Sequence, residues 1–163
     1  MINDKICKAL NEQITLELSS AYIYLAMGAA LEDQNLPGFA RWMKAQYHEE
    51  VAHGMRLFDY VADRGGRVEL GAIEKPPVDF GSPEKVFTTI LEHERKVTAS
   101  IHKLYELAVA EKDYATQTQL HWFINEQVEE EKTAEEILQQ LKALGERTHM
   151  LLVMDHKLGA RES

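Results

Sequence analysis

Residues 65–83 separate two pairs of long periodic segments and set the topology that the chain can adopt. This stretch, GGRVELGAIEKPPVDFGSP, holds four glycines and three prolines, a composition that cannot sustain a long helix. On both sides of it, apolar residues recur every three or four positions, which is the spacing of amphipathic helices. The chain is therefore expected to be all-α, with a long connection between two helical pairs.

Four long helices and one short helix are predicted. Their ranges are about 5–31, 37–64, 83–111, 114–144 and 148–158. Helix starts and stops are indicated by a capping Asn3 or Asp4, by Pro37, by Ser82 before Pro83, and by Gly145. In the first helix the apolar spacing runs through Leu10, Ile14, Leu18, Ala21, Leu25 and Gly28.

The long connection allows the second and third helices to run in the same direction. A helix of about 28 residues is about 42 Å long, whereas about seventeen extended residues reach about 55 Å. The turns near positions 34 and 112 are short, so the helices within each pair are antiparallel. These constraints predict a four-helix bundle with one crossover. With 45% hydrophobic residues, the 163-residue chain is expected to form a single domain, 1–163, whose bundle spans about 5–144.

Composition narrows the partners and the compartment. A formal net charge of −9 argues against nucleic acid, whose binding needs clustered Lys and Arg. No uninterrupted run of 18 apolar residues occurs, so no membrane partner is expected. Cys7 is the single cysteine and the N-terminus lacks a signal-peptide pattern, which favours the cytoplasm. An acidic protein also suits a cationic cargo.

Each of the four apolar seams carries an acid near its centre. The four acids are Glu17, Glu50, Glu94 and Glu130. The first two lie about 17 and 16 residues from the first short turn, and the other two lie about 18 residues on either side of the second. All four carboxylates are therefore expected at nearly the same level of the bundle. A single Glu-x-x-His pair would be interpreted as part of a solvated surface, but matching depths on four separate helices are not explained in that way.

Buried carboxylates at one level imply that cations lie among them, because an isolated ionised carboxylate in an apolar core is very costly. Glu50 and His53 are three residues apart, which places an oxygen ligand and an imidazole on one helix face. Oxygen-rich ligation with a single imidazole suits iron better than zinc, and it disfavours haem.

Four segments carry a resemblance that covers essentially the whole chain. EQITLELSSAYIYLAM, QYHEEVAHGMRLFDYVADRGG, LEHERKVTASI and WFINEQVEEEKTAEEI resemble the helix signatures of bacterial non-haem ferritins. The resemblance implies a ferritin-like bundle that stores iron and oxidises Fe(II) with dioxygen or hydrogen peroxide. It implies one iron at Glu17, Glu50 and His53, and a second at Glu50, Glu94 and Glu130. Gln127 would lie beside the second iron and Tyr24 near the pair.

The resemblance also implies a third iron site and a hollow shell of 24 subunits. The third site matches Glu49, Glu126, Glu129 and Glu130, of which the last three are spaced to share one helical stripe. The apolar run Met150–Met154 resembles the short fifth helix that ferritins place around a four-fold axis. Val68–Ile73 alternates weakly and is expected to pair with its own copy in a two-fold partner.

Two other functional classes remain as alternatives. The first is a non-storage di-iron peroxidase or oxygenase of the rubrerythrin or bacterioferritin type. Those proteins carry a second Glu-x-x-His, whereas positions 127 and 130 are Gln and Glu here, and Val51 stands where a bacterioferritin has its haem methionine. No haem is therefore expected. The second is a purely structural bundle, which leaves the buried acids unexplained.

The remaining conspicuous residues receive ordinary interpretations. Trp42 and Trp122 are expected to pack the core or helix contacts, with electron transfer as an alternative role for Trp122. Cys7 is interpreted as a half-buried small residue. Surface positions are expected for the histidines outside the site: His48, His93, His102, His121, His149 and His156.

Overall fold

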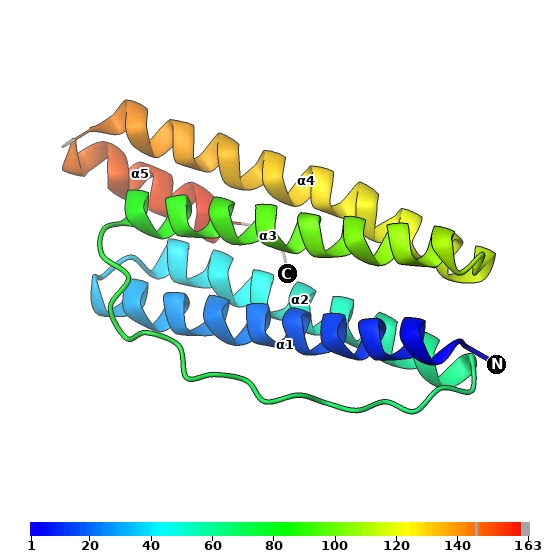
Figure 1. Cartoon of the computed structure of the whole chain (residues 1–163). Helices are drawn as coiled ribbons and strands as arrows, with labels where there is room; N and C mark the ends of the chain where they lie inside the picture. Colours follow the sequence, from blue (N-terminus) through cyan, green and yellow to red (C-terminus); the bar gives the residue numbers. More distant parts are fainter. Residues whose placement is uncertain (146, 161–163) are drawn as a thin grey trace.

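The computed structural model contains five helices within residues 1–145 and 147–160, the part of the chain that it describes. They are α1 (Asp4–Asp33), α2 (Pro37–Asp63), α3 (Pro83–Ala110), α4 (Tyr114–Leu144) and α5 (Thr148–Gly159). The four long helices lie side by side, and α5 returns along the end of the bundle beside α4 and α2 (Figure 1). This arrangement confirms the predicted all-α bundle with a short C-terminal helix, and the helix bounds differ from the prediction by at most two residues.

Most helix starts are capped by nearby side chains. Asn3 accepts a hydrogen bond from the backbone N–H of Lys5, and Ser82 accepts one from Lys85. Asp113 accepts one from the N–H of Thr116 at the start of α4. These bonds satisfy amide groups that a helix leaves unpaired in its first turn.

The start of α2 is capped from a distant part of the chain. Its N-cap residue, Leu36, makes no side-chain capping bond, and the N–H of Phe39 donates instead to Asp155 Oδ1 of α5 at 2.9 Å. Gly38 makes this approach possible, because a Cβ at that position would lie 1.7 Å from the Asp155 carbonyl oxygen. One carboxylate therefore docks α5 onto the bundle.

Ionic contacts at one end of the bundle hold the two helical pairs in register. Arg64, which follows α2, donates to Asp113 at 3.1 and 3.2 Å. Burial alone would raise the pKa of Asp113, but hydrogen bonds from Arg64 and Thr116 outweigh it and lower that pKa. Lys5 of α1 pairs with Glu111 at 2.7 Å. These contacts help to bring the midpoints of all four helices to one level.

The crossover connection runs along the outside of α1 for the length of the bundle (Figure 1). Asn11 donates to the carbonyl oxygen of Arg67 at 2.9 Å, and the N–H of Gly71 donates to Thr15 Oγ1 at 2.9 Å. Near its far end, Gln34 donates to the carbonyl oxygen of Gly81. The pairing of residues 68–73 with a second copy stays a prediction.

The hydrophobic core consists of two clusters separated by the polar layer, the level of Glu17, Glu50, His53, Glu94 and Glu130. One cluster lies toward the α1–α2 turn and includes Met27, Phe39 and Phe87; the other lies toward the α3–α4 turn and includes Leu10, Ile101 and Leu120. The predicted apolar stripe of α1 was wrong at Leu25, which is 38% exposed. Tyr24 occupies the buried position instead, because repeated steps of four drift off a helix face with 3.6 residues per turn.

Among the described residues, one helix, α1, is long and apolar enough by length and composition alone to span a membrane. Here it packs against α2 and α3, and its buried face carries the polar residues Gln13, Glu17 and Ser20. Core helices of bundles commonly have this composition.

Candidate metal centre

Four helices contribute one buried carboxylate each to the polar layer. Glu17, Glu50 and Glu94 are 1–2% exposed, Glu130 is 8% exposed, and His53 is 5% exposed. The prediction that each of the four helices carries a buried acid is thereby confirmed. Each acid replaces an apolar residue in an otherwise regular helical stripe, so its own helix carries it into the core.

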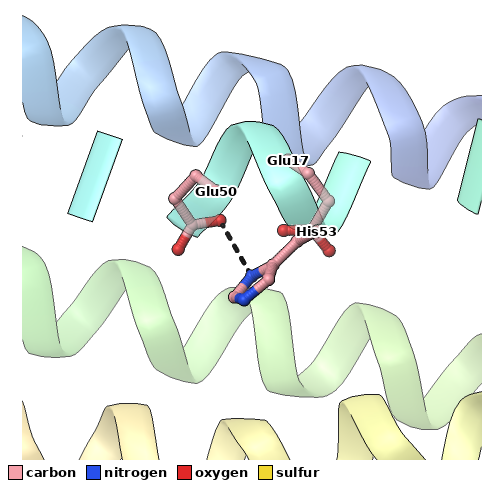
Figure 2. A group of neighbouring side chains, drawn as sticks. All are labelled: Glu17, Glu50 and His53. Atoms are coloured by element: carbon pink, nitrogen blue, oxygen red, sulfur yellow. Dashed lines mark ion pairs between the residues drawn. The ribbon is translucent and has the colours of Figure 1, made fainter. Parts of the chain in front are cut away.

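Glu17, Glu50 and His53 form the more buried of two groups that could hold a metal ion. One ligand atom from each lies within 4.8 Å of the other two, and the three side chains converge from α1 and α2 (Figure 2). The distance from His53 Nδ1 to Glu50 Oε2 is 3.6 Å. Oε2 of Glu17 and Oε2 of Glu50 are buried without a hydrogen-bond partner. Buried oxygens of this kind are costly unless a cation or a proton compensates them.

The second group shares His53 but differs from the ligand set expected from sequence. It consists of His53, Glu126 and Glu130, again with ligand atoms within 4.8 Å, and His53 Nε2 lies 4.0 Å from Glu126 Oε1. The expected set of Glu50, Glu94 and Glu130 is not one of the two groups found among the described residues. Its members nevertheless lie close enough for their charges to raise the pKa of Glu50.

Three acids of the polar layer, Glu17, Glu50 and Glu130, have raised pKa values, which favour their protonated forms. Burial raises the pKa of Glu17 and of Glu50 well above the usual range, and the nearby charges of Glu50 and Glu94, respectively, raise them further. Burial, with the charges of Glu94 and Glu49, raises the pKa of Glu130 to about 7. A cation in the layer would remove this repulsion, so metal binding and proton release are coupled here.

Two predicted residues hold Glu94. Tyr24 donates its hydroxyl to Glu94 Oε1 at 2.5 Å, and Gln127 Nε2 lies 3.2 Å from Glu94 Oε2. Gln127 also donates to Thr98 Oγ1 at 3.2 Å. The structure therefore places Tyr24 and Gln127 as partners of a carboxylate, and the Gln127 amide nitrogen faces that acid.

The three further acids predicted from sequence gather beside the layer. Glu49, Glu126 and Glu129 line a small pocket of about 130 Å³ together with Glu130, Gln46 and Thr133. Glu129 is exposed, whereas Glu49 and Glu126 are half-buried. Gln46 donates to Glu130 Oε2 at 3.0 Å, which ties the pocket to the polar layer.

Trp42 and Trp122 lie in different environments. Trp42 is buried in the apolar cluster, as predicted. Trp122 is half-buried, and its ring lies edge-on to His53 with 5.3 Å between ring centroids. The guanidinium of Arg56 lies 4.2 Å from the centre of the Trp122 ring. Electron transfer from Trp122 stays a prediction.

Sequence reasoning missed the buried polar partners of the acids. Gln13 is 2% exposed and donates to Glu17 Oε1 at 2.8 Å. Its position four residues before Glu17, one helical turn away, could have predicted this contact. The surface prediction for His93 was wrong. It is half-buried, with Nε2 2.7 Å from Ser20 Oγ, and burial lowers its pKa. Cys7 is half-buried, as predicted, and the other histidines outside the site are exposed.

Comparison with known proteins shows which family has this sequence and fold. The model of the ferritin-like domain matches residues 7–144, which is most of the chain. The chain belongs to the ferritin family. As a ferritin it stores iron, and its buried carboxylates and histidine form a ferroxidase-like cluster.

Several relatives match over nearly their whole length. A bacterial non-haem ferritin of Bacteroides fragilis is 41% identical over 99% of this chain and 100% of its own length. A bacterial non-haem ferritin of Staphylococcus aureus is 37% identical over 99% of this chain and 97% of its own length. Among solved structures, an open-pore ferritin from the hyperthermophilic archaeon Archaeoglobus fulgidus superimposes with a TM-score of 0.98. The two sequences are 45% identical, and the superposition covers 99% of this chain and 100% of the archaeal chain.

Proposed function

We propose that this ferritin oxidises Fe(II) to Fe(III) at a pair of iron sites in the polar layer and deposits ferric oxyhydroxide inside a protein shell. The observation that carries the proposal is the cluster of Glu17, Glu50 and His53, whose two unpartnered carboxylate oxygens lie between the two apolar clusters of the core. No packing requirement explains acids at this position, and a divalent cation compensates them.

Glu17, Glu50 and His53 would hold the first ion. Glu50 would bridge to a second ion held by Glu94 and Glu130, with Gln127 beside it. Support for this assignment comes from the burial of the ligands and from the mutual repulsion that raises the pKa values of Glu50 and Glu130. The second set requires Glu94 and Glu130 to move toward Glu50 when the ion binds.

Two adjacent Fe(II) ions can each give one electron to the same oxidant, dioxygen or hydrogen peroxide. Hard carboxylate ligands favour Fe(III) over Fe(II) and therefore the forward direction. The dry apolar walls on either side limit the access of water, and protons held by the acids leave as the cations enter.

The acidic pocket would hold a third iron ion. Glu49, Glu126 and Glu129 would bind it together with Glu130, which belongs to both sites. The proposal is supported by the six residues that line the pocket, four of which are acids, and by the hydrogen bond of Gln46 to Glu130.

The shell would contain 24 copies in octahedral symmetry, each a single domain spanning residues 1–163, in the cytoplasm. Exposed apolar side chains on α5 support association: Met150, Leu152 and Val153 are 38%, 56% and 61% exposed. Apolar surface of this kind is normally buried in an interface, and closed symmetry buries every copy of it.

The test is the double variant Glu50→Ala with His53→Ala in the assembled protein. Rapid Fe(II) oxidation should be lost because two of the three ligands of the first ion are removed, while the helical circular dichroism remains. Glu136→Ala is a matched control, since Glu136 is an exposed acid that faces Lys132. Wild-type initial rates in the double variant would refute the site. Iron uptake separates storage from the peroxidase or oxygenase alternative, because a catalyst would retain about two ions per chain.

A further inference from the structure

The side chain of Gln13 connects the first proposed iron site to α3. It is almost completely buried and makes two hydrogen bonds: its amide nitrogen donates to Glu17 Oε1 at 2.8 Å, and its amide oxygen accepts from Ser100 Oγ at 2.6 Å. The three side chains form a chain from Ser100 on α3 through Gln13 to Glu17 on α1.

The directions of these two bonds are linked. A serine hydroxyl that donates to the amide oxygen of Gln13 requires the amide NH2 group to point the other way, toward Glu17. If the amide flipped, its oxygen would face Glu17, and two acceptors would meet once the carboxylate is ionised, the form that binds a metal ion. By donating to the amide oxygen, Ser100 stabilises the amide orientation that can bind Glu17.

The bond also distinguishes the two oxygens of Glu17. Oε1 is held by Gln13, whereas Oε2 has no hydrogen-bond partner in the protein. Glu17 belongs to the cluster with Glu50 and His53, whose ligand atoms lie within 4.8 Å of one another. With one oxygen fixed, the carboxylate is restrained from rotating and keeps the other available.

We propose that Gln13 is a positioning residue that holds the Glu17 carboxylate ready to bind the first iron ion through one oxygen, and that Ser100 orients Gln13 for this role. The inference rests on the proposed function. Partners that orient a metal ligand commonly contribute about 10- to 100-fold to affinity.

The experiment measures binding of Co(II), a redox-stable substitute for Fe(II), to the assembled full-length protein. Calorimetry reports the affinity of the first ion, and the visible absorption of Co(II) reports its coordination. Gln13→Leu keeps approximately the same volume, which avoids opening the layer toward the hollow of about 240 Å³ that Gln13 and Ser100 also line. It should weaken binding of the first ion by about 10- to 100-fold and change the absorption spectrum.

Ser100→Ala provides a milder test that does not put an apolar group into the layer. It should weaken binding of the first ion by about three- to tenfold, because the Gln13 amide remains but Ser100 no longer orients it. The same change should have no further effect in the Gln13→Leu background, since it acts through Gln13. Asn11→Leu is the control, because it loses a 2.9 Å amide bond on the same helix without contacting the cluster.

The outcomes separate this inference from the proposed function. If Glu17→Gln weakens Co(II) binding but folded Gln13→Leu and Ser100→Ala bind it with wild-type affinity and spectrum, the positioning role is refuted and the iron site stands. Fully additive losses in the double variant would also refute it. If Glu17→Gln has no effect on the first ion, the proposed site itself fails.

Discussion

Glu130 differs from the other acids of the polar layer because it lies at the boundary between the layer and the acidic pocket. It is 8% exposed, compared with 1–2% for Glu17, Glu50 and Glu94. Its pKa is raised to about 7 by burial and by the charges of Glu94 and Glu49. Its protonation therefore changes within the neutral pH range, where a proton and a metal ion compete for the same oxygens.

This titration predicts how the stability of the metal-free protein depends on pH. The pKa of Glu130 is raised from its usual value of 4.5 to about 7 in the folded state, so between these two pH values the folded state binds more protons than the unfolded state. The stability that it contributes is complete below pH 4.5 and is lost as the pH rises through 7. The maximum loss of stability is roughly 3 kcal/mol when this pKa rises from 4.5 to about 7.

The measurement is the thermal midpoint of metal-free protein from pH 5 to pH 8. It should fall with rising pH in the wild type and fall less steeply in Glu130→Gln, whose side chain cannot titrate. Added Co(II) should raise the midpoint most at the high-pH end, because Glu130 is then ionised. Equal slopes in the two proteins would contradict the prediction.

Glu129 permits a separate test of the third ion, because it lines the acidic pocket but does not belong to either group in the layer. Glu129→Gln should change the ratio of iron oxidised to oxidant consumed more than it changes the rate at which the first two ions are oxidised. Stopped-flow oxidation with an oxygen electrode measures both quantities. Glu135→Gln, which removes a half-buried acid that pairs with Arg95 outside the pocket, is the control. An unchanged ratio, with two metals per chain in an anaerobic Fe(II)-soaked crystal, would exclude the third site.

Helix ends were predictable where the cap is local. Asn3, Ser82 and Asp113 each accept a hydrogen bond from an amide two or three positions away, so a short window of sequence contains the whole interaction. The start of α2 was placed by Pro37, but its actual cap comes from Asp155, 116 positions along the chain. The same distinction holds at the site. Spacing predicted the acids, whereas the partnership of Gln13 with Ser100 spans 87 positions and depends on how the helices pack.

The distant cap makes the docking of α5 testable. Asp155→Ala should leave the N–H of Phe39 without its acceptor and cost about 0.5–2 kcal/mol, the usual range for a lost N-cap. Because Met154 and Leu158 still pack against the apolar cluster, the helix should loosen rather than leave the bundle. Hydrogen exchange should therefore become faster in residues 148–159 and at Phe39.

Asp155→Asn is the matched variant, because an amide oxygen can accept the same bond. It should restore most of the protection at Phe39. If Asp155→Ala exchanged at the wild-type rate, the carboxylate would not be what docks α5, and apolar contacts alone would account for its position.

In the whole molecule, the polar layer interrupts a core that would otherwise be continuous. The two apolar clusters lie on either side of it, and the contacts of Arg64 with Asp113 and of Lys5 with Glu111 hold the helical pairs in register at one end. This register was predicted from turn positions alone. What the exposed apolar surface of α5 packs against could not be predicted in the same way, because an interface depends on the position of a second copy of the chain.

Assembly can be tested by changing only the outer surface of α5. Leu152→Ser with Val153→Ser should weaken the shell, because both side chains are exposed and neither belongs to the apolar clusters of the core. Light scattering at micromolar concentration should then show species smaller than 24 copies and poorer iron retention. Initial Fe(II) oxidation should persist, since α5 contributes no residue to the polar layer.

Removing residues from Thr148 onward is the harsher form of this experiment. Helix α4 ends at Leu144 before Gly145, so the four-helix bundle and its acids should remain, although α2 loses its Asp155 cap and the apolar cluster loses Met154 and Leu158. The truncated chain should therefore melt at a lower temperature than the double serine variant while oxidising Fe(II). A native, iron-containing wild type that scatters as a monomer or dimer would exclude the shell and favour a non-storage di-iron enzyme.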